Sequence, residues 1–248
     1  MTDFKNTPEL SESTKPAISY STCYRLPFLS LFHADCMEIM KQYPDKYFDL
    51  AIVDPPYGIH DKLCRKDSPK NKSKFNTLYY EKQWDKKRPD DIYWDEVLRI
   101  SKNQIVFGAN YFSNYLPISR GWVFWDKMGD GMSSVNNELI YTSFDISIKT
   151  FQRCHGLDKG FMNKEGINIH PTQKPVKLYE WILNQFATEG MKILDTHFGS
   201  GSIALAVDKA NRLDKMNLHL TACEIDKEYI DKAIKRISDS IKQGTLSF

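Results

Sequence analysis

The stretch that most constrains the fold runs from Asp49 to Tyr57, where an apolar segment stops at a carboxylate, two prolines and an aromatic ring. Its β-branched residues favour a buried strand, and Pro55 and Pro56 cannot continue a sheet ladder because neither has an N–H group to donate. Asp54 is therefore expected where a central strand ends, which in α/β sheets is the edge that binds ligands. The prolines fix φ at about −65°. The segment predicts a rigid hook for a planar amino group, with the ring of Tyr57 stacked on that group.

Composition argues against several classes of protein for this chain of 248 residues. Its five cysteines are an odd number and form no C-x-x-C pair, which argues against a disulfide framework and a zinc knuckle and fits a reducing cytoplasm. The first residues lack the basic and apolar regions of a secretory signal. No apolar run reaches the length of a membrane span. We therefore expect a soluble cytoplasmic protein without a metal site.

The chain is predicted to form one large domain preceded by an arm. Residues 1–17 are polar and are interpreted as a flexible arm, whereas residues 18–248 alternate between strand and helix patterns. Such alternation argues for a mostly parallel sheet. Segments at about 61–90 and 127–168 are predicted to be insertions in this domain. Helices are predicted over 91–100, 175–186, 203–210 and 225–241, and a further helix is predicted to open at Gly108. Strands are predicted over 104–108, 122–125, 138–144, 146–151, 191–195 and 218–223.

The segment from residue 61 to residue 88 carries most of the charge asymmetry of the chain. It holds ten basic and four acidic residues, a local excess of +6 against +2 for the whole chain. Aromatic residues lie among these charges, and that combination suits a phosphate backbone with exposed bases. We favour nucleic-acid contact over a solvated insertion, and the candidate residues are Lys70, Lys72, Lys74, Lys86, Lys87 and Arg88.

A second unit, over residues 191–224, has the order strand, glycine turn, helix, strand and acid. An acid at the end of the second strand can bind both ribose hydroxyls of a nucleoside. Glycines in the turn let the backbone approach a ligand closely, although the turn is not the G-x-G-x-x-G of dinucleotide folds. The unit predicts nucleoside binding by Asp195, His197, Phe198, Gly199, Ser200, Gly201 and Glu224.

The string from His170 to Pro175 opens a predicted helix, with Pro175 in its first turn. The amides of this turn, at Thr172 and Gln173, and the side chain of Lys174 would make an electropositive end that suits a carboxylate. The alternative is a helix start without a ligand.

These motifs occur in an order that resembles the beta group of DNA amino-methyltransferases. Asp54-Pro55-Pro56-Tyr57 is similar to the catalytic motif of that family, and the string from His170 to Pro175 is typical of it. The turn from Asp195 to Gly201 is similar to its cofactor motif, and the resemblance runs from about residue 31 to residue 237. It implies S-adenosylmethionine as cofactor, whose methionine end would meet the start of the helix. It also implies a doubly wound, mostly parallel seven-stranded α/β sheet, circularly permuted so that the catalytic strand precedes the cofactor unit.

Two cofactor-site positions keep alternatives open. Ala34-Asp35-Cys36 stands where the family has a Gly-Asp-Cys-type stretch near the adenine of the cofactor, so Asp35 is expected either to meet that ring or only to cap the following helix. His197 stands where the family usually has an aromatic residue, and Phe198 follows it, which leaves two candidate rings for the cofactor.

The resemblance implies methylation of the exocyclic amine of a base flipped out of double-stranded DNA. The carboxylate of Asp54 and the carbonyl of Pro55 would accept its two N–H bonds and favour a pyramidal nitrogen, so that positioning and charge complementarity drive the transfer. The leading aspartate favours adenine N6. The alternatives are cytosine N4, a weaker RNA target and, in a different class, a DNA-binding module without turnover. Both insertions are candidates for DNA contact, whereas the recognition sequence, a homodimer and a cognate restriction endonuclease stay open.

Overall fold

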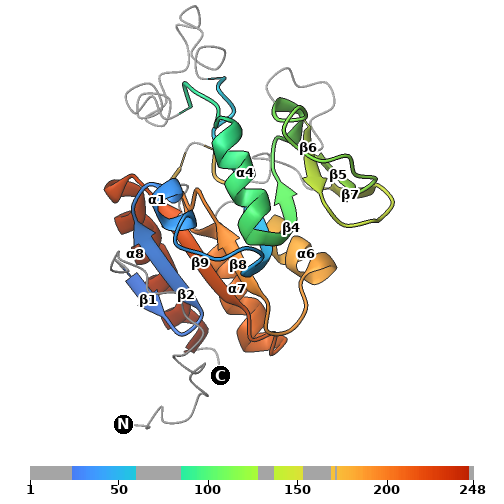
Figure 1. Cartoon of the computed structure of the whole chain (residues 1–248). Coiled ribbons are helices and arrows are strands. Elements are labelled where there is room, and N and C mark those ends of the chain that lie inside the picture. The colour runs from blue at the N-terminus through green and yellow to red at the C-terminus, as the bar shows by residue number, and fades with distance from the viewer. Residues whose placement is uncertain (1–23, 60–84, 128–136, 153–168, 171, 246–248) are drawn as a thin grey trace, which may run out of the picture.

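The computed structural model of the chain describes residues 24–59, 85–127, 137–152, 169–170 and 172–245 (Figure 1). Its strands are β1 (Tyr24–Leu26), β2 (Leu29–His33), β3 (Phe48–Val53), β4 (Ser101–Val106), β5 (Trp122–Asp126), β6 (Glu138–Thr142), β7 (Lys149–Gln152), β8 (Lys192–Asp195) and β9 (His219–Glu224). Its helices are α1 (Cys36–Met40), α4 (Asp91–Ile100), α6 (Val176–Phe186), α7 (Ser202–Leu213) and α8 (Lys227–Thr245), and η2 (Ala109–Tyr111) is a 3-10 turn.

These strands form one sheet in the order β1-β2-β9-β8-β3-β4-β6-β5-β7. The five neighbouring strands β2, β9, β8, β3 and β4 are parallel to one another. The predicted, mostly parallel α/β sheet is therefore confirmed. The predicted count of seven strands is wrong, because the described residues contribute nine. The two edge strands widen the sheet: β1 folds back on β2 through a tight turn at residues 26–29, and β7 pairs in parallel with β5.

Strand β3 lies in the middle of the sheet, and both of its faces are buried. Leu50 and Ile52 belong to one hydrophobic cluster, whereas Ala51 and Val53 belong to the other. A parallel strand that is covered on both faces gives a continuous apolar run in the sequence, which explains the uninterrupted segment before Asp54.

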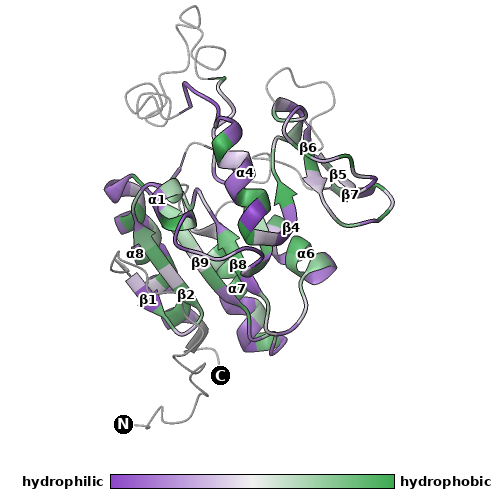
Figure 2. Ribbon diagram, in the orientation of Figure 1, coloured by the Kyte–Doolittle hydropathy of each residue, from purple (hydrophilic) through white to green (hydrophobic). Residues whose placement is uncertain are grey.

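Helices cover both faces of the sheet, as a doubly wound fold requires. Residues of α1 and α4 pack into one cluster, and residues of α6, α7 and α8 pack into the other. Figure 2 shows the central strands largely in the hydrophobic colour, whereas the helices carry both colours. This distribution fits helices that bury one stripe against the sheet and expose the other to water. Within the described residues, no helix is long and apolar enough to cross a membrane.

The chain order of the elements differs from their order in the sheet. Strand β3 precedes the unit β8–α7–β9 by more than a hundred residues, yet β3 pairs directly with β8. The helix predicted to open at Gly108 is limited to the single 3-10 turn η2 in the structure. The neighbouring pair β3 and β8 therefore sets the position of the candidate site.

Candidate active site

Five parallel strands bring functional residues to one edge of the sheet. Asp35 follows β2, Glu224 ends β9, Asp195 ends β8, Asp54 follows β3 and Gly108 lies after β4. The carboxyl ends of parallel strands meet at the same edge, where open α/β sheets bind ligands. The structure thus brings the predicted hook and the predicted nucleoside unit side by side.

Asp54 is held by two side chains. Lys174, which precedes α6, donates to both carboxylate oxygens, with Nζ 2.9 Å from Oδ1 and 2.8 Å from Oδ2. The hydroxyl of Tyr57 donates to Oδ1 at 2.7 Å and accepts from Lys174 at 3.1 Å. The side chains of Lys174 and Asp54 are only 7% and 18% exposed. Hydrogen bonds between charged groups are strong when water is largely excluded, so the hook is fixed by the protein itself.

The expected contact of Lys174 with the carboxylate of a cofactor stays a prediction. The carboxylate nearest its ammonium group in the structure is Asp54, which lies 120 positions earlier in the chain. Sequence spacing gave no signal for this ion pair, because it depends on how the start of α6 packs against the end of β3.

Sequence reasoning missed Glu138, the first residue of β6. Its Oε1 accepts from the hydroxyl of Tyr57 at 2.9 Å and lies 3.6 Å from Nζ of Lys174, and its Oε2 accepts from Nζ of Lys127 at 3.0 Å. The side chain of Glu138 is 10% exposed. The signal that the sequence offers is a charged residue at the start of a largely apolar strand. The structure pairs Glu138 with Trp125, two residues before Lys127.

Burial and charge shift the pKa values in this cluster. Burial lowers the pKa of Lys174, but the two carboxylates outweigh it and hold that pKa above its usual value. Burial raises the pKa of Glu138, but Lys174 and Lys127 outweigh it and hold that pKa below its usual value. Burial and the charge of Glu138 together raise the pKa of Asp54 against the opposing effect of Lys174.

The ring and the hydroxyl of Tyr57 are both engaged. Burial and the two carboxylates keep the pKa of Tyr57 well above its usual value, so the hydroxyl retains its single proton and donates it to one carboxylate at a time. The ring stacks on Tyr111 with centroids 5.1 Å apart and an interplanar angle of 16°. Gly108 has φ +59°, and a Cβ there would lie 2.4 Å from Cζ of Tyr57. Stacking of Tyr57 on a target base stays a prediction.

Arg88, predicted to contact DNA, is exposed but is also tied to the hook. Its Nε donates to the carbonyl of Tyr57 at 2.8 Å, and its Nη1 donates to the carbonyl of Tyr111 at 3.1 Å. Lys86 and Lys87 are exposed. The other three candidates for DNA contact, Lys70, Lys72 and Lys74, lie outside the described residues.

The glycine turn and the acid after β9 are joined by hydrogen bonds. Glu224 accepts one backbone N–H on each oxygen, from Gly199 at 2.8 Å and from Asp226 at 2.9 Å. A carboxylate has about four acceptor positions in all, so these two bonds leave Glu224 with acceptor capacity for a hydroxyl group. Asp195 is 3% exposed and accepts the backbone N–H of His197 at 3.0 Å. Burial raises the pKa of Asp195 to about 8.

The two candidate rings of the turn differ in their surroundings. Phe198 is 3% exposed and packs in the hydrophobic core, whereas His197 is only partly buried. Thr196 links His197 to the core, because its Oγ1 lies 2.9 Å from Nδ1 of His197 and 2.7 Å from the hydroxyl of Tyr93. Burial lowers the pKa of His197 to about 4, so the imidazole is neutral near neutral pH.

The residues just before α6 lie against the glycine turn. The ring of His170 packs on Tyr229 of α8, with centroids 4.4 Å apart, and a Cβ at Gly199 would lie 3.8 Å from this imidazole. The side chain of Gln173 accepts the backbone N–H of Ile169 at 3.1 Å, and Thr172 Oγ1 lies 3.2 Å from His170 Nδ1. The ring of His170 thus lies beside the glycine turn, and the other two contacts hold the string together. Ser200, also a candidate, is buried, and its Oγ lies 3.1 Å from that of Ser202.

Asp35 caps α1, as one of its two interpretations predicted. Its Oδ1 accepts the backbone N–H of Met37 at 2.8 Å. The N–H of Ala34 donates to the carbonyl of Glu224 at 3.2 Å, so the cap adjoins the end of β9. The capping interpretation is confirmed, and contact with an adenine ring stays a prediction.

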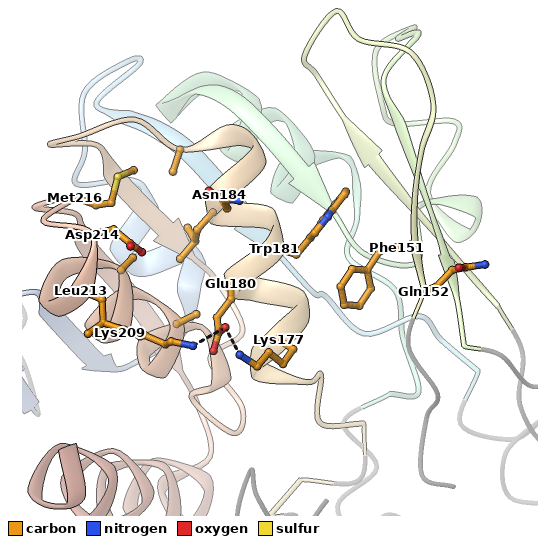
Figure 3. A pocket seen from close by; sticks show the side chains of 14 residues that line it. Phe151, Gln152, Lys177, Glu180, Trp181, Asn184, Lys209, Leu213, Asp214 and Met216 are labelled. Carbon is orange, nitrogen blue, oxygen red and sulfur yellow. Dashed lines mark hydrogen bonds and ion pairs between the residues drawn. The ribbon is translucent and has the colours of Figure 1, made fainter. Parts of the chain in front are cut away.

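A separate hollow lies away from this edge, between α6, α7 and β7 (Figure 3). Its volume is about 890 Å³, and its lining includes Trp181, Phe151 and Leu213. Glu180 accepts from Lys177 at 2.7 Å and from Lys209 at 2.9 Å within it. None of the hook residues lines this hollow, so the chemistry described above belongs to the sheet edge.

Comparison with known proteins agrees with this geometry. A family model described as DNA methylase, of the N6 and N4 type, matches residues 63–235. The chain is 24% identical to the type II methyltransferase M1.MboII of Moraxella bovis, over 80% of this chain and 92% of that protein. It is 25% identical to the type II methyltransferase M.BamHI of Bacillus amyloliquefaciens, over 80% of this chain and 56% of that longer protein.

Solved structures share the fold. The cytosine-N4-specific PvuII DNA methyltransferase superposes with a TM-score of 0.55 at 13% identity, over 91% of this chain and 95% of that chain. The TTHA0409 protein of Thermus thermophilus, solved in complex with S-adenosyl-L-methionine, superposes with a TM-score of 0.50 at 15% identity, over 85% of this chain and 95% of that chain. At such identities the likeness establishes the architecture alone.

Proposed function

The chain belongs to the DNA methylase family of N6 and N4 amino-methyltransferases, and we propose that it methylates the N6 amine of adenine in double-stranded DNA with S-adenosylmethionine. The observation that carries this proposal is the adjacency of β3 and β8. It brings the Asp54 hook beside the turn from Asp195 to Gly201.

The residues at the ends of β8 and β9 fit this cofactor. Glu224 keeps acceptor capacity beyond its backbone hydrogen bonds, and an acid at the end of this strand suits the hydroxyls of a ribose. The buried carboxylate of Asp195 suits the ammonium group of a methionine moiety. His197 belongs to this turn, and the ring of His170, which precedes α6, borders it. Bound S-adenosylmethionine supplies an electrophilic methyl group on a positively charged sulfur.

Asp54 and Pro55 orient the amine. The lone pair of an exocyclic amine is conjugated with its ring, so the nitrogen is a poor nucleophile. When the Asp54 carboxylate and the Pro55 carbonyl accept its two N–H bonds, the nitrogen becomes pyramidal and its lone pair points away from them. The transfer then depends on positioning and on acceptors that are fixed in advance. A base inside a duplex cannot reach the hook, so the target must be flipped out.

Sequencing of genomic DNA from a host that expresses this chain, with detection of modified bases, tests the proposal. We expect N6-methyladenine at one recurring sequence that is absent from the same host without the chain. N4-methylcytosine at a recurring sequence would change the target base and retain the reaction class. Unmodified DNA, from cells in which the folded protein accumulates, would contradict a DNA methyltransferase.

A further inference from the structure

A second carboxylate, that of Glu138, contacts the hook, and the proposed chemistry does not use it. Glu138 and Asp54 lie on opposite sides of the same two groups, the hydroxyl of Tyr57 and the ammonium of Lys174. Lys127 holds the other oxygen of Glu138 at 3.0 Å. Two acids and two lysines therefore share one largely buried cluster, in which each charge has an opposite partner.

The hydrogen bonds to Asp54 leave its two oxygens unequal. While Tyr57 donates to Asp54 rather than to Glu138, Oδ1 accepts from both Tyr57 and Lys174, whereas Oδ2 accepts from Lys174 alone. A carboxylate oxygen has two acceptor positions. In this arrangement the described contacts fill Oδ1, and Oδ2 retains one position, which would meet the N–H of an incoming amine.

We infer that Glu138 is a positioning residue for methyl transfer: it holds the hydroxyl of Tyr57 and the ammonium of Lys174 against Asp54, so that Oδ2 stays open and correctly directed. This inference rests on the proposed function, because it assigns Asp54 as the acceptor of the amine. Without Glu138, Tyr57 and Lys174 have only Asp54 as an acidic partner in the cluster, and both can shift toward the remaining acceptor on Oδ2.

Several titratable and charged groups besides Glu138 face Asp54. Tyr93 of α4, Tyr179 of α6 and Asp195 at the end of β8 lie within electrostatic reach of Asp54. Tyr57 and Lys174 contact it directly, and Lys127 acts through Glu138. The charge of Glu138 raises the pKa of Asp54. Its removal is therefore expected to move the acid limb of activity to lower pH.

Glu138→Gln tests the inference with purified full-length protein, S-adenosylmethionine and DNA from a host that lacks the modification. We expect kcat to fall by up to about 100-fold, the scale of a small misplacement of reacting groups. The dissociation constant of S-adenosylmethionine should change by less than about threefold, because Glu138 makes no contact with the cofactor unit. The acid limb of the kcat profile, which reports groups in the enzyme–substrate complex, should move to lower pH.

Glu180→Gln is the matched control, because Glu180 also accepts from two lysines but lies in the separate hollow (Figure 3). It should leave kcat and the acid limb unchanged. Lys127→Gln is a second variant for the case in which Glu138→Gln does not fold. Loss of a positive charge beside Glu138 should lower kcat and move the limb to higher pH.

The outcomes separate the two proposals. If the wild type is active and Glu138→Gln has the same kcat and the same acid limb, the positioning role alone is overturned. If Glu138→Gln is unfolded, unchanged kcat and an unchanged limb in Lys127→Gln overturn that role in the same way. A folded wild-type chain that transfers no methyl group overturns the proposed function, and this inference falls with it.

Discussion

Replacing Lys174 by methionine distinguishes two roles for this side chain. The sequence favours a role at the carboxylate of the cofactor, whereas in the structure the ammonium group lies 2.9 and 2.8 Å from the two oxygens of Asp54. Methionine keeps an unbranched, flexible chain that can fill the same space. The substitution therefore removes the charge and its hydrogen bonds while retaining most of the packing.

The cost in stability follows from burial. Lys174 is 7% exposed, and removing one partner of a buried ion pair costs about 3–5 kcal/mol. Asp54 is 18% exposed and retains some contact with water, so we expect the lower end, about 3 kcal/mol. In a chain of this size that loss lowers Tm by roughly 6–12 °C. Lys209→Met is the control: Lys209 pairs with Glu180 but is 38% exposed, and an exposed pair contributes at most about 1 kcal/mol.

The effect on activity has a definite sign. Because the charge of Lys174 lowers the pKa of Asp54, its loss should raise that pKa further and keep a larger fraction of Asp54 protonated near neutral pH. A protonated carboxyl group is a poorer acceptor for the amine, so kcat should fall and its acid limb should move to higher pH. Methyl transfer at saturating cofactor, measured across the pH range, reports both changes.

Calorimetric titration with S-adenosylmethionine, below the Tm of both proteins, decides between the roles. If Lys174 acts at Asp54, the dissociation constant should change by less than about threefold. If Lys174 instead bound the cofactor carboxylate, losing a hydrogen bond between charged groups would cost about 1.5–3 kcal/mol, a weakening of roughly 10- to 150-fold. Such weakening with an unchanged kcat would refute the arrangement described here.

Three further predictions concern other parts of the site. Gly108→Ala adds a Cβ that would lie 2.4 Å from Cζ of Tyr57 at a position with φ +59°. We expect a stability loss of about 1–3 kcal/mol and a lower kcat with unchanged cofactor affinity. A kcat equal to that of the wild type would contradict the packing of Tyr57 on Gly108. Burial raises the pKa of Asp195 to about 8, so binding of a cationic ammonium group should release the proton of Asp195, and cofactor affinity should rise as pH approaches this value. Calorimetry in buffers of different ionisation enthalpy measures the proton release, which Asp195→Asn should abolish. Replacing Lys70, Lys72 and Lys74 by Gln should flatten the slope of log DNA affinity against log salt by up to about 3, if all three contact phosphate, without changing cofactor binding; an unchanged slope would leave the segment as a solvated insertion.

The parts of the site that could be predicted from sequence are those whose chemistry is local. Two prolines after an apolar strand fix the end of β3 wherever that strand lies, so Asp54 could be placed at the sheet edge. The same holds for the strand, glycine turn and acid that end at Glu224. Each depends on backbone preferences of neighbouring residues, which adjacent positions in the sequence reveal.

The rest depends on contacts between distant segments. Glu138 meets Tyr57 across 81 positions, and Lys174 meets Asp54 across 120. Arg88 belongs to a basic segment whose composition suits DNA, yet its guanidinium group donates to the carbonyls of Tyr57 and Tyr111. No periodicity encodes such pairs. The width of the sheet was also misjudged, because β1 and β7 are short edge strands with little burial to mark them.

The central claim is that the carboxylate of Asp54 acts in methyl transfer and has no part in holding the cofactor. The most direct measurement is single-turnover transfer from labelled S-adenosylmethionine to DNA by the wild type and Asp54→Ala, with the product nucleosides identified by mass spectrometry. We predict N6-methyladenine from the wild type, and no product from Asp54→Ala although this variant still binds DNA and binds the cofactor nearly as well as the wild type. Full transfer by Asp54→Ala, or a loss of cofactor binding equal to that of Asp195→Ala, would contradict the account.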